Sequence, residues 1–113
     1  MKYLWGLVLF FALPAMAQGF LPGTEDIPLM KGLSEVEETA SFDSPSERMV
    51  LISAQTSVPA QKVESFYKQT LSNLGWTEVR PNGFVRGNDS FYFEISPKGG
   101  MSQIQFRLGQ RNP

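Results

Sequence analysis

The sequence predicts an α+β fold in which one amphipathic helix packs on a mainly antiparallel sheet of four to six strands, preceded by an extended N-terminal arm. One segment has apolar residues at helical spacing, and two later segments alternate between apolar and polar residues. Turn-forming residues separate several short strands. A strand that alternates in this way has one polar face, so the helix is expected to cover the apolar face.

The composition sets limits on function. The chain of 113 residues has the size of a single domain, and 42% of its residues are hydrophobic, which is too many for a disordered chain. It contains no cysteine and no histidine. Disulfides, thiolate metal sites and catalysis by Ser-His-Asp or Cys-His sets are therefore excluded. The formal net charge is −1 and no basic stripe is visible, which argues against a nucleic-acid-binding protein.

Residues 1–17 have the pattern of a cleaved signal peptide. Lys2 supplies the positive charge, residues 4–13 form an apolar run, and Pro14 precedes an Ala-Met-Ala sequence that ends at Ala17. The run is about half as long as the roughly 20 residues of a membrane span. An uncleaved anchor or a buried core helix is the alternative. We therefore expect cleavage after Ala17 and a periplasmic or secreted bacterial protein with no stable membrane span.

Residues 18–33 are predicted to form the extended N-terminal arm. Pro22 and Pro28 oppose a helix. The segment nevertheless carries five large apolar residues: Phe20, Leu21, Ile27, Leu29 and Met30. We expect the arm to dock on the domain formed by residues 34–113, with a solvated tail as the alternative.

Two strands are expected before the helix. A weak edge strand is predicted at residues 39–42, followed by a turn at 44–47 and a central strand at 48–55. In the central strand Met49 and Leu51 alternate with Val50 and Ile52, so both faces carry apolar side chains. Such a strand is typically covered on both sides, and the arm is expected to cover one of them.

The helix is predicted from Pro59 to Leu74. Proline is tolerated at a helix start. Apolar positions at i, i+3, i+4, i+7, i+8 and i+11 form one continuous stripe, made of Val63, Phe66, Tyr67, Thr70, Leu71 and Leu74. Gly75 suits the left-handed position after the last turn, and Trp76 suits the apolar contact that follows.

Four strands are predicted after the helix, at residues 76–79, 84–86, 90–96 and 102–108. In the last two, the expected inward side chains are Phe91, Phe93, Ile95, Ile104, Phe106 and Leu108. The expected outward side chains include Tyr92, Glu94, Gln105 and Arg107. The aromatic residues Trp76, Phe84, Phe91 and Phe106 could line a pocket, although a domain of this size needs most of them for its core.

Residues 63–76 have the sequence VESFYKQTLSNLGW, with a Phe-Tyr pair, a Leu four residues after the Tyr and a Leu-Gly-Trp ending. This FYxxxLxxLGW pattern resembles one found in small uncharacterised exported proteins of the bacterial envelope. The order of elements around it is similar to that of the helix-grip domains of BamC-type outer-membrane assembly lipoproteins. The resemblance covers about residues 48–108. It implies the same fold and compartment, and it supplies no catalytic residue.

No group of residues predicts catalysis. Ser65 and Lys68 lie at i, i+3 on the polar side of the helix, where a lysine stays protonated. Glu35, Glu37 and Glu38 fit a solvated acidic segment better than the carboxylate pair of a glycosidase. We therefore expect a protein that is not an enzyme and that uses no metal and no cofactor.

Tyr92, Arg107, Glu94 and Gln105 are the candidate binding residues. If the inward side chains are as expected, Tyr92 and Arg107 could be cross-strand neighbours with the guanidinium over the ring. Tyr and Arg are also enriched in binding hot spots. We expect an interaction module that binds another envelope protein through its sheet face, an edge strand or the arm, with strand addition as the simplest mode. The alternative is a carrier of a small apolar ligand or lipid in a cavity between helix and sheet. The oligomeric state stays open.

Overall fold

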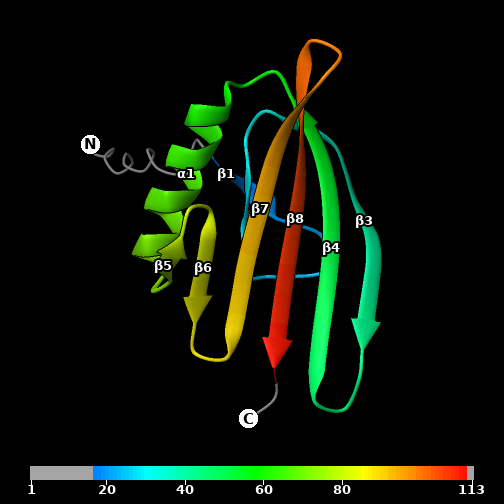
Figure 1. Ribbon diagram of the computed structural model, residues 1–113, viewed down its shortest axis with the longest axis vertical. Coiled ribbons are helices and arrows are strands. Elements are labelled where there is room, and N and C mark those ends of the chain that lie inside the picture. Colours follow the sequence, from blue (N-terminus) through cyan, green and yellow to red (C-terminus); the bar gives the residue numbers. More distant parts are fainter. Residues whose placement is uncertain (1–16, 112–113) are drawn as a thin grey trace, which may run out of the picture.

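The computed structural model describes residues 17–111 and confirms the α+β fold (Figure 1). Within this range, one helix and a six-stranded antiparallel sheet form the main body, and a two-stranded sheet is added to them. The elements in chain order are β1 (Ala17–Phe20), β2 (Pro28–Met30), β3 (Leu33–Asp43), β4 (Glu47–Thr56), α1 (Ala60–Asn73), β5 (Thr77–Arg80), β6 (Gly83–Arg86), β7 (Asp89–Lys98) and β8 (Met101–Arg111). Residues 1–16 of the expected signal peptide lie outside the described residues.

The large sheet has the strand order β3-β4-β8-β7-β6-β5 with antiparallel neighbours throughout. Ile52 of β4 lies opposite Phe106 of β8, which in turn lies opposite Phe93 of β7. By register and alternation, the same face carries the buried side chains of Val50, Ala54, Phe84, Phe91, Ile104 and Leu108. We call this the inner face and the opposite side of the same sheet the outer face. The expected inward and outward residues of β7 and β8 are therefore confirmed.

The helix packs on the inner face through the predicted stripe. Its buried residues are Val63, Phe66, Tyr67 and Leu71. The stripe is wrong at its end, because Leu74 is the C-cap residue and its side chain is 45% exposed. The chain reverses at this point, and Trp76 rather than Leu74 enters the core, where it is 3% exposed.

The reversal after the helix is a Schellman motif. The amide of Trp76 donates to the carbonyl of Leu71 at 2.9 Å, and the amide of Gly75 donates to the carbonyl of Ser72 at 3.2 Å. Gly75 has a φ of 92°, a left-handed conformation that glycine adopts without steric cost. The predicted roles of Gly75 and Trp76 are thus confirmed.

Tyr67 lies at the centre of the core. Ring centroids 4.9 to 6.0 Å from its own belong to Phe66, Phe91, Phe93 and Phe106. Its hydroxyl donates to the carbonyl of Pro28 at 2.9 Å and accepts from the amide of Met30 at 3.4 Å. One side chain therefore connects α1, the large sheet and β2. Burial raises the pKa of its phenol well above the ordinary value, and the hydrogen bond from Met30 offsets part of this shift.

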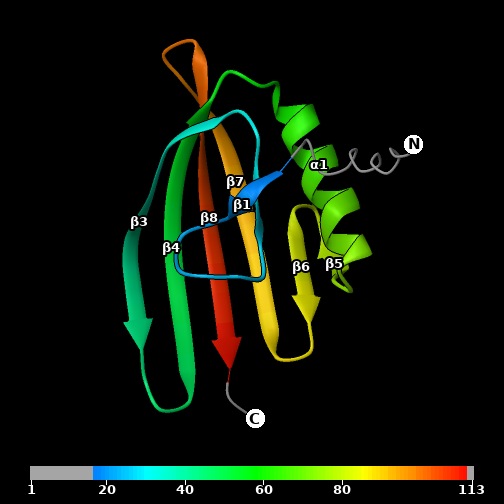
Figure 2. The ribbon, with the colours of Figure 1, turned by 180° about the vertical axis from the view of Figure 1, so that it is seen from behind.

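Residues 21–30 cross the inner face beside the helix. In Figure 1 this segment passes behind β7, β8 and β4, and in Figure 2 it passes in front of them. Its buried side chains, Leu21, Ile27 and Met30, belong to the same core cluster as those of α1 and the sheet. A Cβ added at Gly23 would lie 3.1 Å from Cγ1 of Val50 on β4. Asp26 forms an ion pair of 3.1 Å with Arg86 of β6.

The expectation that both faces of β4 are covered is wrong, because the arm and the helix lie on the same face of the sheet. The arm shares the inner face with the helix, because α1 lies along the side of the sheet formed by β5 and β6 (Figure 1) and a helix with its side chains is only about 10–12 Å wide. Six strands spaced about 4.8 Å apart span about 24 Å across the sheet. The helix therefore leaves part of the inner face uncovered, and the arm fills it. Met49 and Leu51 are half-buried on the outer face.

Arg86 fastens the arm to the end of the helix. Besides the ion pair with Asp26, its guanidinium donates to the carbonyl of Leu74 at 3.2 Å and lies 4.8 Å from the ring centroid of Trp76. Trp76 Nε1 is the one buried side-chain nitrogen or oxygen in residues 17–111 that has no hydrogen-bond partner.

Both edges of the large sheet are irregular. β3 forms one edge, as predicted, but it spans residues 33–43 instead of 39–42. Its pairing with β4 is interrupted between Ser34 and Glu37 and again between Glu38 and Ala40. Bulges of this kind break the alternation of side chains, which explains why the sequence pattern there was weak. At the other edge, β5 is exposed throughout and irregular between Glu78 and Arg80.

The other strands of the large sheet agree with the sequence prediction to within three residues, whereas β1 and β2 lie in the segment predicted only as an extended arm. β4, β7 and β8 extend one to three residues beyond the predicted segments 48–55, 90–96 and 102–108. β5 is shifted by one residue, and β6 begins one residue earlier than predicted.

Candidate functional site

The four candidate binding residues lie together on the outer face. Tyr92 of β7 is directly opposite Arg107 of β8, and Glu94 is opposite Gln105 one step along the same pair of strands. Tyr92 is half-buried and the other three are exposed. The register therefore places the Tyr92–Arg107 and Glu94–Gln105 pairs next to each other on the outer face. A shift of the register by one residue would have turned these side chains toward the core.

A guanidinium stacks on the Tyr92 ring, but it is not the predicted guanidinium of Arg107. The guanidinium over the Tyr92 ring belongs to Arg80, whose Cζ lies 4.1 Å from the ring centroid. Arg80 is opposite Gly83 of β6, and Gly83 is opposite Tyr92. A Cβ at Gly83 would lie 2.6 Å from Cγ and 2.9 Å from Nε of Arg80. The absence of a side chain at Gly83 therefore lets Arg80 lie across β6 and reach Tyr92.

Tyr92 is held from its other end as well. Its hydroxyl donates to a carboxylate oxygen of Glu94 at 2.9 Å. This hydrogen bond raises the pKa of the Tyr92 phenol, while the nearby charges of Arg80 and Arg107 act in the opposite direction. Arg80, Tyr92 and Glu94 thus form an ordered polar chain on the surface of the sheet.

The apolar half of the outer face lies beside this chain. Arg107 is opposite Leu51 of β4, which is opposite Ala40 of β3. In the next row Met49 is opposite Phe42, whose side chain is 60% exposed. An open hollow of about 470 Å³ surrounds this corner, lined by Ser41, Phe42, Asp43, Ser44, Glu47 and Met49. A smaller hollow of about 190 Å³ follows beside Leu51, Tyr92 and Arg107.

We call this surface the outer band and define it by Phe42, Met49, Leu51, Arg107, Tyr92 and Arg80. Sequence reasoning found Tyr92 and Arg107 but missed the other four. Met49 and Leu51 were recognised as one apolar face of β4 but were expected to be covered, and Arg80 lay outside the predicted strands 76–79 and 84–86. Phe42 lies in the predicted edge strand 39–42, where no face was assigned to it, and its pairing with Met49 is regular.

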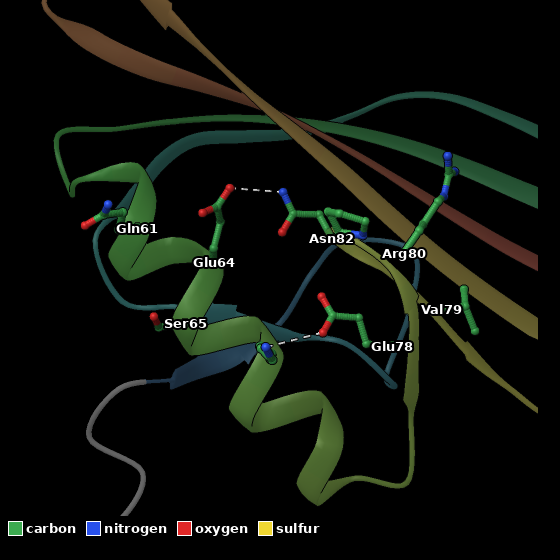
Figure 3. Close-up of a pocket in the computed structure, with 9 residues that line it drawn as sticks. Gln61, Glu64, Ser65, Glu78, Val79, Arg80 and Asn82 are labelled. Carbon is green, nitrogen blue, oxygen red and sulfur yellow. Dashed lines mark hydrogen bonds and ion pairs between the residues drawn. The ribbon is translucent and has the colours of Figure 1, made fainter.

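A third surface hollow lies between α1 and the β5–β6 turn, and Figure 3 shows its lining. It has a volume of about 760 Å³. Asn82 donates to a carboxylate oxygen of Glu64 at 3.1 Å, and Lys68 forms an ion pair with Glu78 at 3.6 Å. Arg80 extends away from these residues (Figure 3). Lys68 and Glu78 are thus paired with each other, and the carboxylate of Glu64 is occupied by the amide of Asn82.

The geometry gives no support to the catalytic arrangements considered from the sequence. Lys68 pairs with Glu78 and its side chain is 68% exposed, so it is not the desolvated partner that Ser65 would need. Glu35, Glu37 and Glu38 are exposed on β3. Within residues 17–111, no group of three or more acidic side chains is placed to hold a metal ion.

The space between helix and sheet is filled by side chains. Trp76, Phe84, Phe91 and Phe106, which could have lined a pocket, are 1–3% exposed and belong to the core cluster. Phe91 stacks on Phe106 with ring centroids 5.8 Å apart. The buried hydroxyl of Thr56 donates to the carbonyl of Gly32 at 2.9 Å and accepts from the amide of Val58 at 3.0 Å.

Two further findings concern the chain as a whole. No helix in the described part of the chain, residues 17–111, is long and apolar enough to cross a membrane. The resemblance of residues 63–76 to the envelope proteins stays a prediction. Comparison of the chain with protein-family models, with curated protein sequences and with solved structures gave no match.

Proposed function

We propose that this protein is a non-catalytic interaction module that binds another protein through the outer face of its sheet, in the periplasm or after secretion. The observation that carries the proposal is the outer band. It is a continuous surface across β3, β4, β8, β7 and β5 that combines apolar side chains, a tyrosine and two arginines. None of the elements formed by residues 17–111 covers it.

The size of this face suits a protein partner. Four neighbouring strands are about 19 Å wide, and ten residues of a strand are about 34 Å long. This gives roughly 650 Å², close to the about 800 Å² that each partner contributes to a standard interface. Tyrosine and arginine at the centre of such a face are the residue types that most often dominate binding energy.

The other surfaces considered from the sequence are less suitable. The edge strands β3 and β5 both carry irregular pairing, and β3 has exposed carboxylates at Glu35, Glu37 and Glu38. Natural sheets use bulges and charges of this kind to prevent strand addition. The arm contributes Leu21 and Ile27 to the core, at 1% and 0% exposure. An arm engaged in this way does not offer its apolar side chains to a partner.

The core also favours an interaction module over a carrier. The rings around Tyr67 occupy the helix–sheet interface, where a carrier would hold its apolar ligand. The hollows described above lie at the surface and have mixed polar linings.

Site-specific crosslinking tests the proposal. A photo-reactive residue is placed at Gln105 on the outer face or, as a control, at Gln69 on the exposed side of α1, and the full chain is expressed in its native host. Both positions are exposed. We expect a crosslinked product of defined mass from position 105 that is lost with Arg107→Glu, and no such product from position 69. A lone monomer from position 105 would reject the outer face as the binding surface.

A further inference from the structure

The outer band is chemically divided along its length. On β3 and β4 it is apolar, with Phe42, Met49 and Leu51. On β8 and β5 it is cationic, with Arg107 and Arg80 on either side of the Tyr92 ring. The two halves lie on adjoining strands, so that Leu51 of β4 is directly opposite Arg107 of β8.

The two guanidiniums are not neutralised by the fold. The ion pairs of residues 17–111 join Lys68 to Glu78 and Arg86 to Asp26, so neither involves Arg80 or Arg107. The carboxylate nearest along β7, that of Glu94, accepts the hydroxyl of Tyr92. Planar guanidiniums bind carboxylates in a bidentate geometry. The cationic half of the band therefore has unused capacity for a carboxylate.

The position of Arg80 is fixed in advance. Its side chain lies against the face of the Tyr92 ring, with Cζ 4.1 Å from the ring centroid. It can cross β6 because Gly83 has no side chain there. A stacked guanidinium keeps its N–H edges free for an anion, since stacking uses only its face. The same stacking covers one face of the Tyr92 ring, which argues against a sugar that stacks there.

We propose that the outer band binds an acidic and apolar segment of a partner protein, with an apolar side chain on Phe42, Met49 and Leu51 and a carboxylate on Arg107 and Arg80. This inference rests on the proposed function and specifies the partner. Charge complementarity selects against basic segments, which Arg80 and Arg107 would repel.

The strand spacing sets the pattern that the segment must carry. Leu51 and Arg107 lie on neighbouring strands, about 4.8 Å apart, and β3 and β7 are about 14 Å apart. The carboxylate of the partner must therefore lie about 5 to 15 Å from its apolar anchor. Positions i and i+3 or i+4 of a helix provide the short end of this range, as do positions i and i+2 of a strand.

A peptide selection tests the inference. The purified chain is used to select from a random displayed library, and the selected peptides are then titrated as free labelled peptides by fluorescence anisotropy. We expect peptides with Asp or Glu beside large apolar residues. Their lysine-substituted versions should bind at least 10-fold more weakly. Arg107→Glu should weaken binding at least 10-fold, and Arg80→Gln should weaken it several-fold.

The matched control is Lys62→Glu, which makes the same charge change on the exposed polar side of α1. It should change affinity less than about 2-fold, so that the effect of Arg107→Glu cannot arise from net charge alone. Circular dichroism of each variant checks that the fold is retained. Chemical-shift changes on peptide binding should fall on the outer residues of β4, β8 and β7.

Several outcomes would overturn the inference. Peptides that map to the outer face but are basic, or indifferent to charge, would reject the acidic partner and leave the proposed function intact. A library that yields no binder, or a dimer of the chain that Arg107→Glu dissociates, would also reject it. Peptides that map only to the hollow between α1 and the β5–β6 turn, or to a sheet edge, would reject it too. The crosslinking at position 105 then decides the proposed function separately.

Discussion

Replacing Tyr67 by phenylalanine should weaken the attachment of the arm while the aromatic core stays filled. The ring keeps its contacts with Phe91, Phe93 and Phe106, but the hydroxyl is lost. The carbonyl of Pro28 then loses a donor at 2.9 Å in a buried site. The variant therefore loses stability at the contact between α1 and the arm.

The magnitude follows from the two hydrogen bonds. Leaving a buried backbone group without a partner costs about 1–3 kcal/mol. The bond from the amide of Met30, at 3.4 Å, is long and adds little to this. We expect a loss of about 1.5–3 kcal/mol in the free energy of unfolding. At about 4–8 °C per kcal/mol for a domain of this size, the melting temperature should fall by roughly 6–24 °C.

The assay is urea unfolding followed by circular dichroism, with Tyr92→Phe as the matched control. The same atom is removed there, but from a hydroxyl that meets Glu94 at the surface. The control should change stability by less than about 0.5 kcal/mol. Hydrogen exchange should quicken at residues 21–30 in Tyr67→Phe before it does so in β4 or β8. Equal midpoints for the two variants would refute the idea that Tyr67 holds the arm.

Three other perturbations test the same architecture. Leu71→Asp places a charge at a residue that is 0% exposed and should unfold the domain. Leu74→Asp, at a residue that is 45% exposed, should shift the urea midpoint only slightly. Similar urea midpoints for the two variants would contradict the packing of α1. Deletion of Gly19–Lys31 removes the three residues that the arm contributes to the core cluster, for an upper limit of about 5–9 kcal/mol. It should produce binding of an apolar dye that the intact chain lacks, and an unchanged melting curve would reject the role of the arm. Burial raises the pKa of Tyr67, so its neutral form stabilises the fold below a pH of about 10, and this contribution is lost as the pH rises above that value. Alkaline titration should therefore destabilise the native protein more than the Tyr67→Phe variant. Equal losses of stability in the two proteins would contradict the burial of a neutral Tyr67.

The elements with a clear side-chain period were predicted well from the sequence. The helix stripe, the left-handed Gly75 and the inward residues of β7 and β8 follow from local spacing, because each is decided by residues close in the chain. The acidic edge strand was predicted too short because its side chains lack a clear period. Two irregular positions in β3 remove the alternation, so the pattern shows less strand than the backbone forms.

The position of the arm and the make-up of the outer band could not be predicted in the same way. Apolar residues on both faces of β4 suggested cover on both sides, but the sequence does not show that the helix lies to one side of the sheet and leaves part of the inner face open. Likewise, Arg107 was the only arginine that alternation placed beside Tyr92. Arg80 reaches that ring because β5 and β6 pair in a register that puts Gly83 between them. Such contacts depend on which strands become neighbours, which local patterns do not specify.

The division of the sheet into a sealed face and an open face is the claim on which the account depends, and thiol labelling tests it most directly. The chain has no cysteine, so single cysteines at Ser53 and Ala54 report on adjacent positions of β4 without background. Ala54 is 1% exposed on the inner face, and Ser53 lies on the outer face opposite Gln105. We predict rapid labelling of Ser53→Cys and labelling of Ala54→Cys that is at least 100-fold slower until denaturant is added. Equal rates at the two positions would contradict the account.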